Sequence, residues 1–308
     1  MSKQCLLFLT LIIFIVSSIA HAQPPFFRTG DGKIKLKNTH NGREISITYV
    51  NADGTLNEAA YQQIDSVFGF PTKEKGENIS RRLISLLDHF VDEIDSEKVI
   101  YITSGYRSPA YNQKLRDRGK TAAKSSTHID GMALDFYLEG RTPSNAKALW
   151  EKIRALDCCG VGHYGGKNIH LDAGRPRFWQ QATAKVNTGD PAHNRFIYYS
   201  TDYDRYKAGD AFRSFLTSIS DFGFGIKNKL EIVTDEEKPR KVAKVKIATS
   251  HKKSCLDVTE RKAARFIKAS FPDNIKPGRY RVKVSFCDRQ FEDMPEDKLS
   301  NPVEIVAQ

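Results

Sequence analysis

The sequence predicts an α+β domain followed by a module that resembles a β-sandwich. Up to about Trp179, short runs of alternating apolar and polar residues are interspersed with runs of helical periodicity, which is typical of mixed α and β structure. Beyond about Ala182, short β-type runs are separated by Asp, Gly, Pro and Lys. A chain of 308 residues is also long enough for about two domains. We therefore expect domains at residues 23–182 and 183–308.

Residues 1–22 have the composition of a secretory signal peptide. Lys3 supplies the positive charge, Leu6 to Val16 form the apolar run, and Ala20-His21-Ala22 provides small residues around a cleavage site. An uncleaved membrane anchor is the alternative, but the run is short for a bilayer span of about 20 residues. We expect cleavage after Ala22, no transmembrane segment in the mature chain, and a periplasmic or secreted location.

The first domain begins with two strands whose apolar residues alternate, at 34–36 and 45–49, joined by turn residues at 38–42. Apolar residues then follow helical spacing from Ile79 to Ile94, with Asn78 placed to cap the helix. The later elements, predicted from the same patterns, are a strand at 99–103, a helix at 108–115, a strand at 132–138, a helix at 144–156 and a strand pair within 161–172. We expect a small antiparallel sheet with flanking helices.

The second domain is predicted to be rich in β-strands. Its β-type runs are 196–199, 212–219, 229–233, 241–248, 280–286 and 302–306, and residues 259–269 form the one helix-like stretch. Cys255 and Cys287 lie in this segment, and we expect a disulfide between them because an exported chain meets an oxidising environment. A bond between the adjacent Cys158 and Cys159 would be strained, so both cysteines can equally be buried thiols.

Composition and charge exclude several classes of protein. Hydrophobic residues make up 40% and charged residues 28%, which excludes a wholly disordered chain, a collagen-like fibre and a multi-span membrane protein. The formal charge of +11 favours a polyanionic partner. For an exported protein we expect anionic polymers of the cell envelope rather than nucleic acid. Solvated surface is the alternative interpretation of the basic clusters in the second domain.

A candidate metal site is formed by His128, Asp135 and His170. His128 and Asp135 are joined by the small residues Gly131 and Ala133, which leave room for a ligand beside the backbone. Strand alternation places His170 and Asp172 on one face. Two imidazoles and a carboxylate suit zinc, and a set of three protein ligands leaves a coordination position open for catalysis. We expect one Zn²⁺ ion.

These motifs resemble those of the periplasmic murein endopeptidases of the YcbK type (murein endopeptidase K). That family lies within the group of zinc D-Ala-D-Ala peptidases that shares the hedgehog-domain fold. The resemblance covers about half of the chain, and the matching segments are Asn38–Gly42, Ser104–Asn112, Ser126–Asp135, Gly160–Tyr164 and His170–Trp179.

The resemblance implies zinc at the three candidate ligands and a substrate among the stem or cross-link peptides of peptidoglycan. Arg107 matches the position that stabilises the oxyanion; a salt bridge between strand and helix is the alternative. Ser126 and Tyr106 are the expected substrate-binding residues, and Ser126 could instead cap a loop.

The proton-transfer residue is less sharply indicated, because residues 163–168 contain no carboxylate. Asp172 is the first candidate and His163 the second, although Asp172 could instead orient His170. Both endopeptidase and carboxypeptidase activities are compatible with the sequence. The competing functions are a non-catalytic envelope-binding protein that retains the zinc fold and a zinc peptidase that acts on protein.

Overall fold

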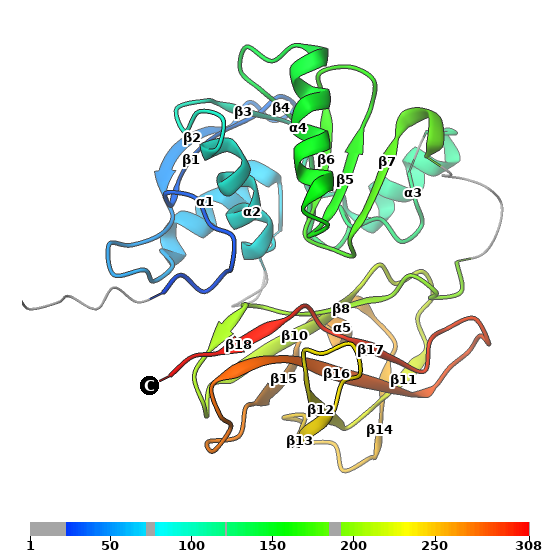
Figure 1. Ribbon diagram of the computed structural model, residues 1–308. Helices are drawn as coiled ribbons and strands as arrows, with labels where there is room; N and C mark the ends of the chain where they lie inside the picture. The colour runs from blue at the N-terminus through cyan, green and yellow to red at the C-terminus, as the bar shows by residue number, and fades with distance from the viewer. Residues whose placement is uncertain (1–22, 72–77, 121, 185–191, 308) are drawn as a thin grey trace, which may run out of the picture.

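The computed structural model describes residues 23–71, 78–120, 122–184 and 192–307. Figure 1 shows two bodies, an upper one in blue to green that contains most of the helices and a lower one in yellow-green to red. We call them the N-terminal module (described residues up to 184) and the C-terminal module (192–307). The predicted signal peptide lies outside the described residues, and the domain boundary at 182/183 stays a prediction. No helix in the described ranges has the length and apolarity needed to cross a membrane.

A seven-stranded sheet forms the centre of the N-terminal module, with the strand order β2-β1-β3-β4-β6-β5-β7. Its strands are β1 (Lys33–Asn38), β2 (Glu44–Thr48), β3 (Ile100–Ser104), β4 (Ala133–Leu138), β5 (Gly160–His163), β6 (Ile169–Asp172) and β7 (Arg177–Gln180). The predicted small antiparallel sheet is therefore corrected in two respects. The sheet is larger, and the pairs β1–β3 and β5–β7 are parallel. For β1 and β3 the reason is the long helical connection between them, which returns the chain in the same direction.

The helices of this module are α1 (Glu58–Phe68), α2 (Arg81–Asp92), α3 (Pro109–Asp117) and α4 (Pro143–Ala155). Helix α2 corresponds to the periodic run predicted at 79–94, but its N-cap is Ser80 rather than Asn78. The Ser80 hydroxyl accepts a hydrogen bond from the Leu83 N–H at 3.3 Å. Helix α3 begins directly after Ser108, which caps it, with Pro109 in the first turn.

The two faces of the sheet have different roles. Leu134, Phe136 and Leu138 of β4 join an apolar core that also contains the buried residues of α1, α2 and α4. Since side chains alternate along a strand, Asp135 lies on the opposite face. Helices α1, α2 and α4 therefore cover one face, and Asp135 points away from them on the opposite face.

In the C-terminal module two sheets share one apolar core. The three-stranded sheet contains β8 (Tyr198–Thr201), β10 (Ala211–Thr217) and β15 (Ile267–Ser270). The eight-stranded sheet contains β9 (Arg205–Tyr206), β11 (Phe224–Lys227), β12 (Lys229–Thr234), β13 (Lys241–Lys246), β14 (Cys255–Val258), β16 (Gly278–Asp288), β17 (Asp297–Leu299) and β18 (Val303–Ile305). The predicted helix at 259–269 is shorter than expected, because only α5 (Arg261–Arg265) is helical and β15 follows it. A short 3-10 turn (Gln181–Thr183) ends the N-terminal module.

The four cysteines of the described chain behave in two ways. Cys255 and Cys287 form the predicted disulfide, which joins β14 to β16 across the intervening strand β11. Cys158 and Cys159 are free thiols, and Cys159 is buried. The adjacent pair is therefore not bonded.

Buried polar contacts hold the two modules together. Arg82 of α2 pairs with Asp204 at 2.6 Å and donates to the Thr201 carbonyl oxygen at 2.9 Å. The chain before β1 also contacts the C-terminal module, because Arg205 donates to the carbonyl oxygens of Pro24 and Phe26 at 2.8 and 2.7 Å. The modules therefore share an ordered interface.

Candidate active site

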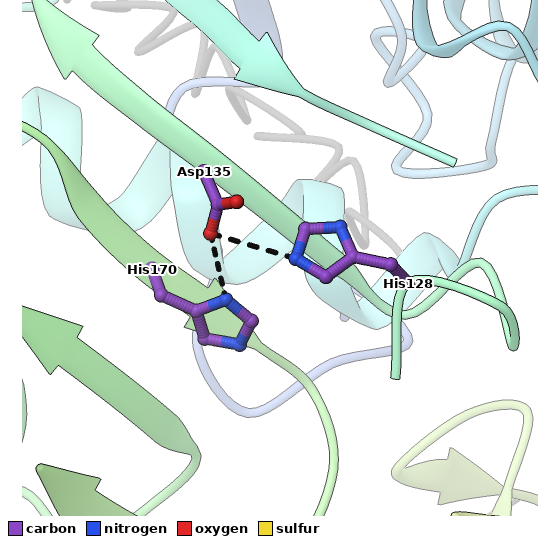
Figure 2. A group of neighbouring side chains, drawn as sticks. All are labelled: His128, Asp135 and His170. Atoms are coloured by element: carbon purple, nitrogen blue, oxygen red, sulfur yellow. Dashed lines mark hydrogen bonds and ion pairs between the residues drawn. The ribbon is translucent and has the colours of Figure 1, made fainter. Parts of the chain in front are cut away.

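Asp135 and His170 come from neighbouring strands in the middle of the sheet. They are direct partners in the antiparallel pairing of β4 with β6. His170 Nδ1 lies 2.9 Å from Asp135 Oδ1, and both side chains are buried on the face that the helices leave free. Figure 2 shows both side chains converging with His128. The sheet therefore fixes two of the three predicted ligands.

His128 reaches this position from the loop that precedes β4. Its Nε2 lies 3.5 Å from Asp135 Oδ1, and its Nδ1 is 2.8 Å from the Gly105 carbonyl oxygen. The carbonyl oxygen accepts from Nδ1–H and leaves Nε2 with a free lone pair toward Asp135. Gly131 has φ +67°, and a Cβ there would lie 2.5 Å from the Phe70 ring. The tight turn after His128 therefore requires glycine.

The donor set fits a zinc ion. One ligand atom from each of His128, Asp135 and His170 lies within 4.8 Å of the others, and all three residues are buried. Burial by itself would raise the pKa of Asp135, but His128 and His170 lower it well below its ordinary range. Two imidazole nitrogens and one carboxylate oxygen are the donors of a zinc site with an open position. Elsewhere in the described chain, the one other comparable group is Asp31, Asp88 and Asp92, which lacks an imidazole.

Asp172 lies behind His170. Its Oδ2 is 2.8 Å from His170 Nε2, it pairs with Arg177 at 2.8 Å, and its side chain is fully buried. Burial would raise the pKa of Asp172, but Arg177 and His170 lower it. A carboxylate that accepts from Nε2–H turns His170 Nδ1 toward the metal position. This geometry favours the second interpretation of Asp172, that it orients His170.

His163 does not reach the site. It is paired with Ile169, whereas its neighbour Gly162 is paired with His170. Because paired residues point to the same face, the His163 side chain lies on the helix side of the sheet, where its ring centroid is 6.4 Å from that of Trp150. The structure therefore shows no contact between His163 and the candidate ligands, and its role in proton transfer stays a prediction.

The Arg107 side chain contacts one of the candidate ligands, Asp135. Its Nη2 pairs with Asp135 Oδ2 at 2.9 Å and its Nε donates to Ser104 Oγ at 2.9 Å. The guanidinium also lines the cleft beside the metal position. Both predicted roles of Arg107, the salt bridge and the cation at the site, are compatible with this position.

The two predicted substrate-binding residues differ in their placement. Ser126 lines the cleft, and its Oγ accepts from the His128 N–H at 3.4 Å. Tyr106 packs against the apolar core, with its ring centroid 4.7 Å from that of Phe70, and it is not among the cleft-lining residues of the described chain. Tyr106 thus packs against the core beside the site, and its role in substrate binding stays a prediction.

Tyr164 and Trp179 also contact the candidate ligands, and neither was predicted as a site residue. Tyr164 donates its hydroxyl to Asp135 Oδ1 at 3.3 Å, and burial raises the pKa of this phenol. The Trp179 ring centroid lies 4.8 Å from that of His170. Both residues belong to the segments that resemble the murein endopeptidases. Their position within those segments was the available signal.

Comparison with known proteins shows which family the chain belongs to. Residues 29–179 match the family described as Peptidoglycan L,D-endopeptidase MepK. The chain is 31% identical over 147 residues to Peptidoglycan L,D-endopeptidase MepK of Escherichia coli (strain K12), covering 47% of this chain and 79% of that protein. It is 38% identical over 82 residues to the Probable peptidoglycan L,D-endopeptidase MepK of Haemophilus influenzae, covering 26% of this chain and 42% of that protein. The chain belongs to the MepK family.

The family match includes every candidate ligand but not the whole cleft. The cleft has a volume of about 440 Å³ and extends from His128 and His170 past Trp179 to Phe196 and Ser218. Phe196 and Ser218 belong to the C-terminal module, beyond the residues that match MepK. Part of the cleft wall is therefore supplied by a segment outside the family match.

Proposed function

We propose that this chain is a zinc-dependent peptidase that hydrolyses cross-link or stem peptides of peptidoglycan. Membership of the MepK family makes the chain a peptidoglycan peptidase. The observation that carries the zinc assignment is the convergence of His128, Asp135 and His170 at the floor of an open cleft. The curated relatives are named L,D-endopeptidases, and this favours cleavage within cross-links over removal of a terminal residue.

His128, Asp135 and His170 would hold the ion, which supplies a Lewis acid for the attack of water on an amide carbonyl. Asp172 positions His170 by accepting its Nε2–H. Gly105 positions His128 in the same way through its carbonyl oxygen. Each imidazole therefore has one nitrogen fixed by the protein and one directed to the metal position.

Arg107 provides positive charge at the cleft surface. Its guanidinium is held by Asp135 and Ser104, so it is oriented before substrate arrives. A fixed cation stabilises the negative charge that develops on the carbonyl oxygen during hydrolysis. Ser126 is the proposed substrate-binding residue, because it lies both in the cleft and beside the His128 backbone.

We also propose that residues 1–22 direct export and that the mature protein acts in the periplasm or outside the cell. The Cys255–Cys287 disulfide supports this location, since disulfides persist in oxidising compartments. The formal charge of +11 supports association with peptidoglycan and other anionic envelope polymers.

The test uses the purified chain from residue 23 to 308 and cross-linked muropeptides of defined structure. We expect products of peptide-bond cleavage, identified by mass, that disappear with a chelator and return with zinc. His128→Ala should abolish cleavage, whereas exchange of the exposed His251 for alanine should leave it unchanged. Binding of muropeptides without any product, or cleavage that persists in His128→Ala, would contradict the proposal.

A further inference from the structure

The wall that the C-terminal module adds to the cleft has a distinct chemical character. Phe196 is 44% exposed, which is unusual for a side chain of this size, and it lines the cleft. It follows the 3-10 turn and belongs to the C-terminal module. An exposed aromatic ring at one end of a cleft provides an apolar surface for a bound ligand.

Arg175 lies against the Phe196 ring. Its guanidinium carbon is 5.1 Å from the centroid of the Phe196 ring, a cation–π contact that holds the planar group over the ring. The two other cleft arginines have carboxylate partners, Arg107 with Asp135 and Arg177 with Asp172. Arg175 forms no ion pair with any acidic side chain in the described residues.

The surroundings of Arg175 are electropositive. Burial and then the charge of Arg175 lower the pKa of Lys298 in β17, which shows that the two cations are close enough to repel each other. No Asp or Glu is found among the described residues that line the cleft. Asp172, the nearby carboxylate, is already bound by His170 and Arg177. This end of the cleft therefore carries positive charge that no described carboxylate neutralises.

We infer that Arg175 and Phe196 form a subsite that binds a carboxylate-bearing segment of the substrate peptide. The inference rests on the proposed function for the nature of the substrate. The guanidinium presents paired N–H donors that match a carboxylate, and the Phe196 ring keeps them in one plane before binding. Phe196 also covers an apolar part of the same peptide. The C-terminal module thus takes part in substrate recognition and is more than an appendage.

The position of Phe196 relative to the metal site is fixed by contacts between the modules. Asp130, two residues after His128, accepts from the Ser218 N–H at 2.9 Å and pairs with Arg261 of α5. Asn194 accepts from the Ser220 N–H at 2.9 Å, which ties the segment before Phe196 to the same region. The subsite and the metal ligands are therefore held in one frame, as recognition of a single peptide requires.

The test compares two forms of one cross-linked stem peptide, one with free carboxylates and one with those carboxylates amidated. Steady-state kinetics are measured with the zinc-loaded chain from residue 23 to 308. Arg175→Gln and Phe196→Ala should each raise KM for the carboxylate peptide about tenfold and change kcat by less than about twofold. Arg175→Gln should leave KM for the amidated peptide nearly unchanged, whereas Phe196→Ala also loses an apolar contact and should raise KM for both peptides. Arg240→Gln and Val242→Ala, both at exposed positions outside the cleft, are the matched controls.

The outcomes separate this inference from the proposed function. If the unaltered chain cleaves the peptide and Arg175→Gln keeps its KM, the subsite is wrong and the peptidase stands. A fall in kcat of equal size on both peptides would show a structural role and would also overturn the inference. If the unaltered chain cleaves neither peptide, the proposed function fails. Equilibrium binding of the two peptides then tests the subsite separately. The inference requires that Arg175→Gln bind the carboxylate peptide more weakly than the unaltered chain does.

Discussion

His170 is held between two carboxylates that act on different ring nitrogens. Asp135 lies at Nδ1 and Asp172 at Nε2. Burial lowers the pKa of His170, but the hydrogen bonds to Asp135 and Asp172 outweigh burial and raise it. Hydrogen bonds at both nitrogens hold the imidazole in one orientation, so its Nδ1 is directed to the candidate metal position without further ordering.

Removal of Asp172 should weaken metal binding. In Asp172→Ala, His170 loses the acceptor for its Nε2–H, and Arg177 loses its partner. We expect zinc affinity to fall about 10- to 100-fold, measured by competition with a chromophoric chelator. Asp257→Ala changes an exposed carboxylate and is the control. Unchanged zinc affinity in Asp172→Ala would show that Asp172 does not orient the ligand.

Asp88 makes the stability of the protein depend on pH. Burial raises its pKa to about 7, although a hydrogen bond from the Tyr49 hydroxyl lowers it in part. An aspartate in the unfolded chain has a pKa of about 3.9, so between pH 4 and 7 the folded state holds the proton that the unfolded state has lost. The contribution of Asp88 to the free energy of unfolding therefore falls as the pH rises through this range.

The Asp88→Asn variant tests this dependence. Asparagine keeps an oxygen that can accept from Tyr49 and Gly32, but it does not ionise. We expect the decline between pH 4 and 7, on the order of 2–4 kcal/mol in the original chain, to be absent in the variant. Urea denaturation at several pH values measures it, and Asp257→Asn should retain the decline. The same pH slope in Asp88→Asn would assign it to other groups.

At the scale of single elements, β5 tolerates little change at its two glycines. A Cβ at Gly162 would lie 2.4 Å from Trp179 Cε2, so even alanine must displace the indole that packs on His170. Gly160 is similarly restricted, since its Cβ would lie 2.2 Å from Asp172 Oδ2. The glycines of β5 therefore leave the space that the residues behind the metal ligand occupy.

Gly162→Ala should destabilise the protein by about 1–3 kcal/mol and reduce activity by moving Trp179. Gly166→Ala is a matched control from the following turn, because a Cβ there meets no atom within 4 Å. Chemical denaturation measures the stability of both variants, and turnover of a muropeptide measures the activity. Equal stability of Gly162→Ala and Gly166→Ala would contradict the packing argument.

The elements differ in how far the sequence could predict them. Helix α2 has a continuous apolar stripe and was predicted. Helix α1 was missed, because polar residues interrupt the stripe formed by Tyr61, Ile64 and Phe68, although Asn57 is a recognisable N-cap. The parallel pairing of β1 with β3 is a contact between distant segments, and local periodicity carries no information about it.

The candidate site shows the same division. His128, Asp135 and His170 were predicted from residue types and spacing, and the structure brings them together. The side chains of His163 in β5 and His170 in β6 point to opposite faces of the sheet. The pairing register of the two strands shows this, and local sequence does not. Phe196 could not be assigned to the cleft from sequence, since it lies beyond the resemblance and reaches the site through tertiary packing.

At the scale of the whole molecule, one buried arginine joins the two modules. Arg82 is 9% exposed and contacts Asp204 and the Thr201 carbonyl oxygen, both in the C-terminal module. Burying an arginine is tolerable when its charge and its donors are satisfied, and removing one partner leaves the other buried without compensation. The interface therefore depends on both members of the Arg82–Asp204 pair.

Arg82→Ala should lower stability by about 3–5 kcal/mol, because it leaves Asp204 unpaired. Weaker coupling between the modules should also separate their unfolding, so that a single calorimetric transition becomes two. The exposed Arg240→Ala, which loses a surface pair with Glu236, should change stability by less than about 1 kcal/mol. A single transition at the original temperature in Arg82→Ala would show that other contacts hold the modules.

The contact between residues 24–27 and the C-terminal module has a consequence for biosynthesis. Pro24 and Phe26 leave the ribosome long before Arg205, whose side chain binds their carbonyl oxygens. The Phe27 N–H likewise lacks its acceptor until Asp204 has been synthesised. Since translation proceeds at about 5–20 residues per second, roughly 180 residues correspond to a delay of about 10–40 seconds. Late in that interval the nascent chain already contains all three candidate zinc ligands but lacks Asp204 and Arg205, which later bind residues 24–27.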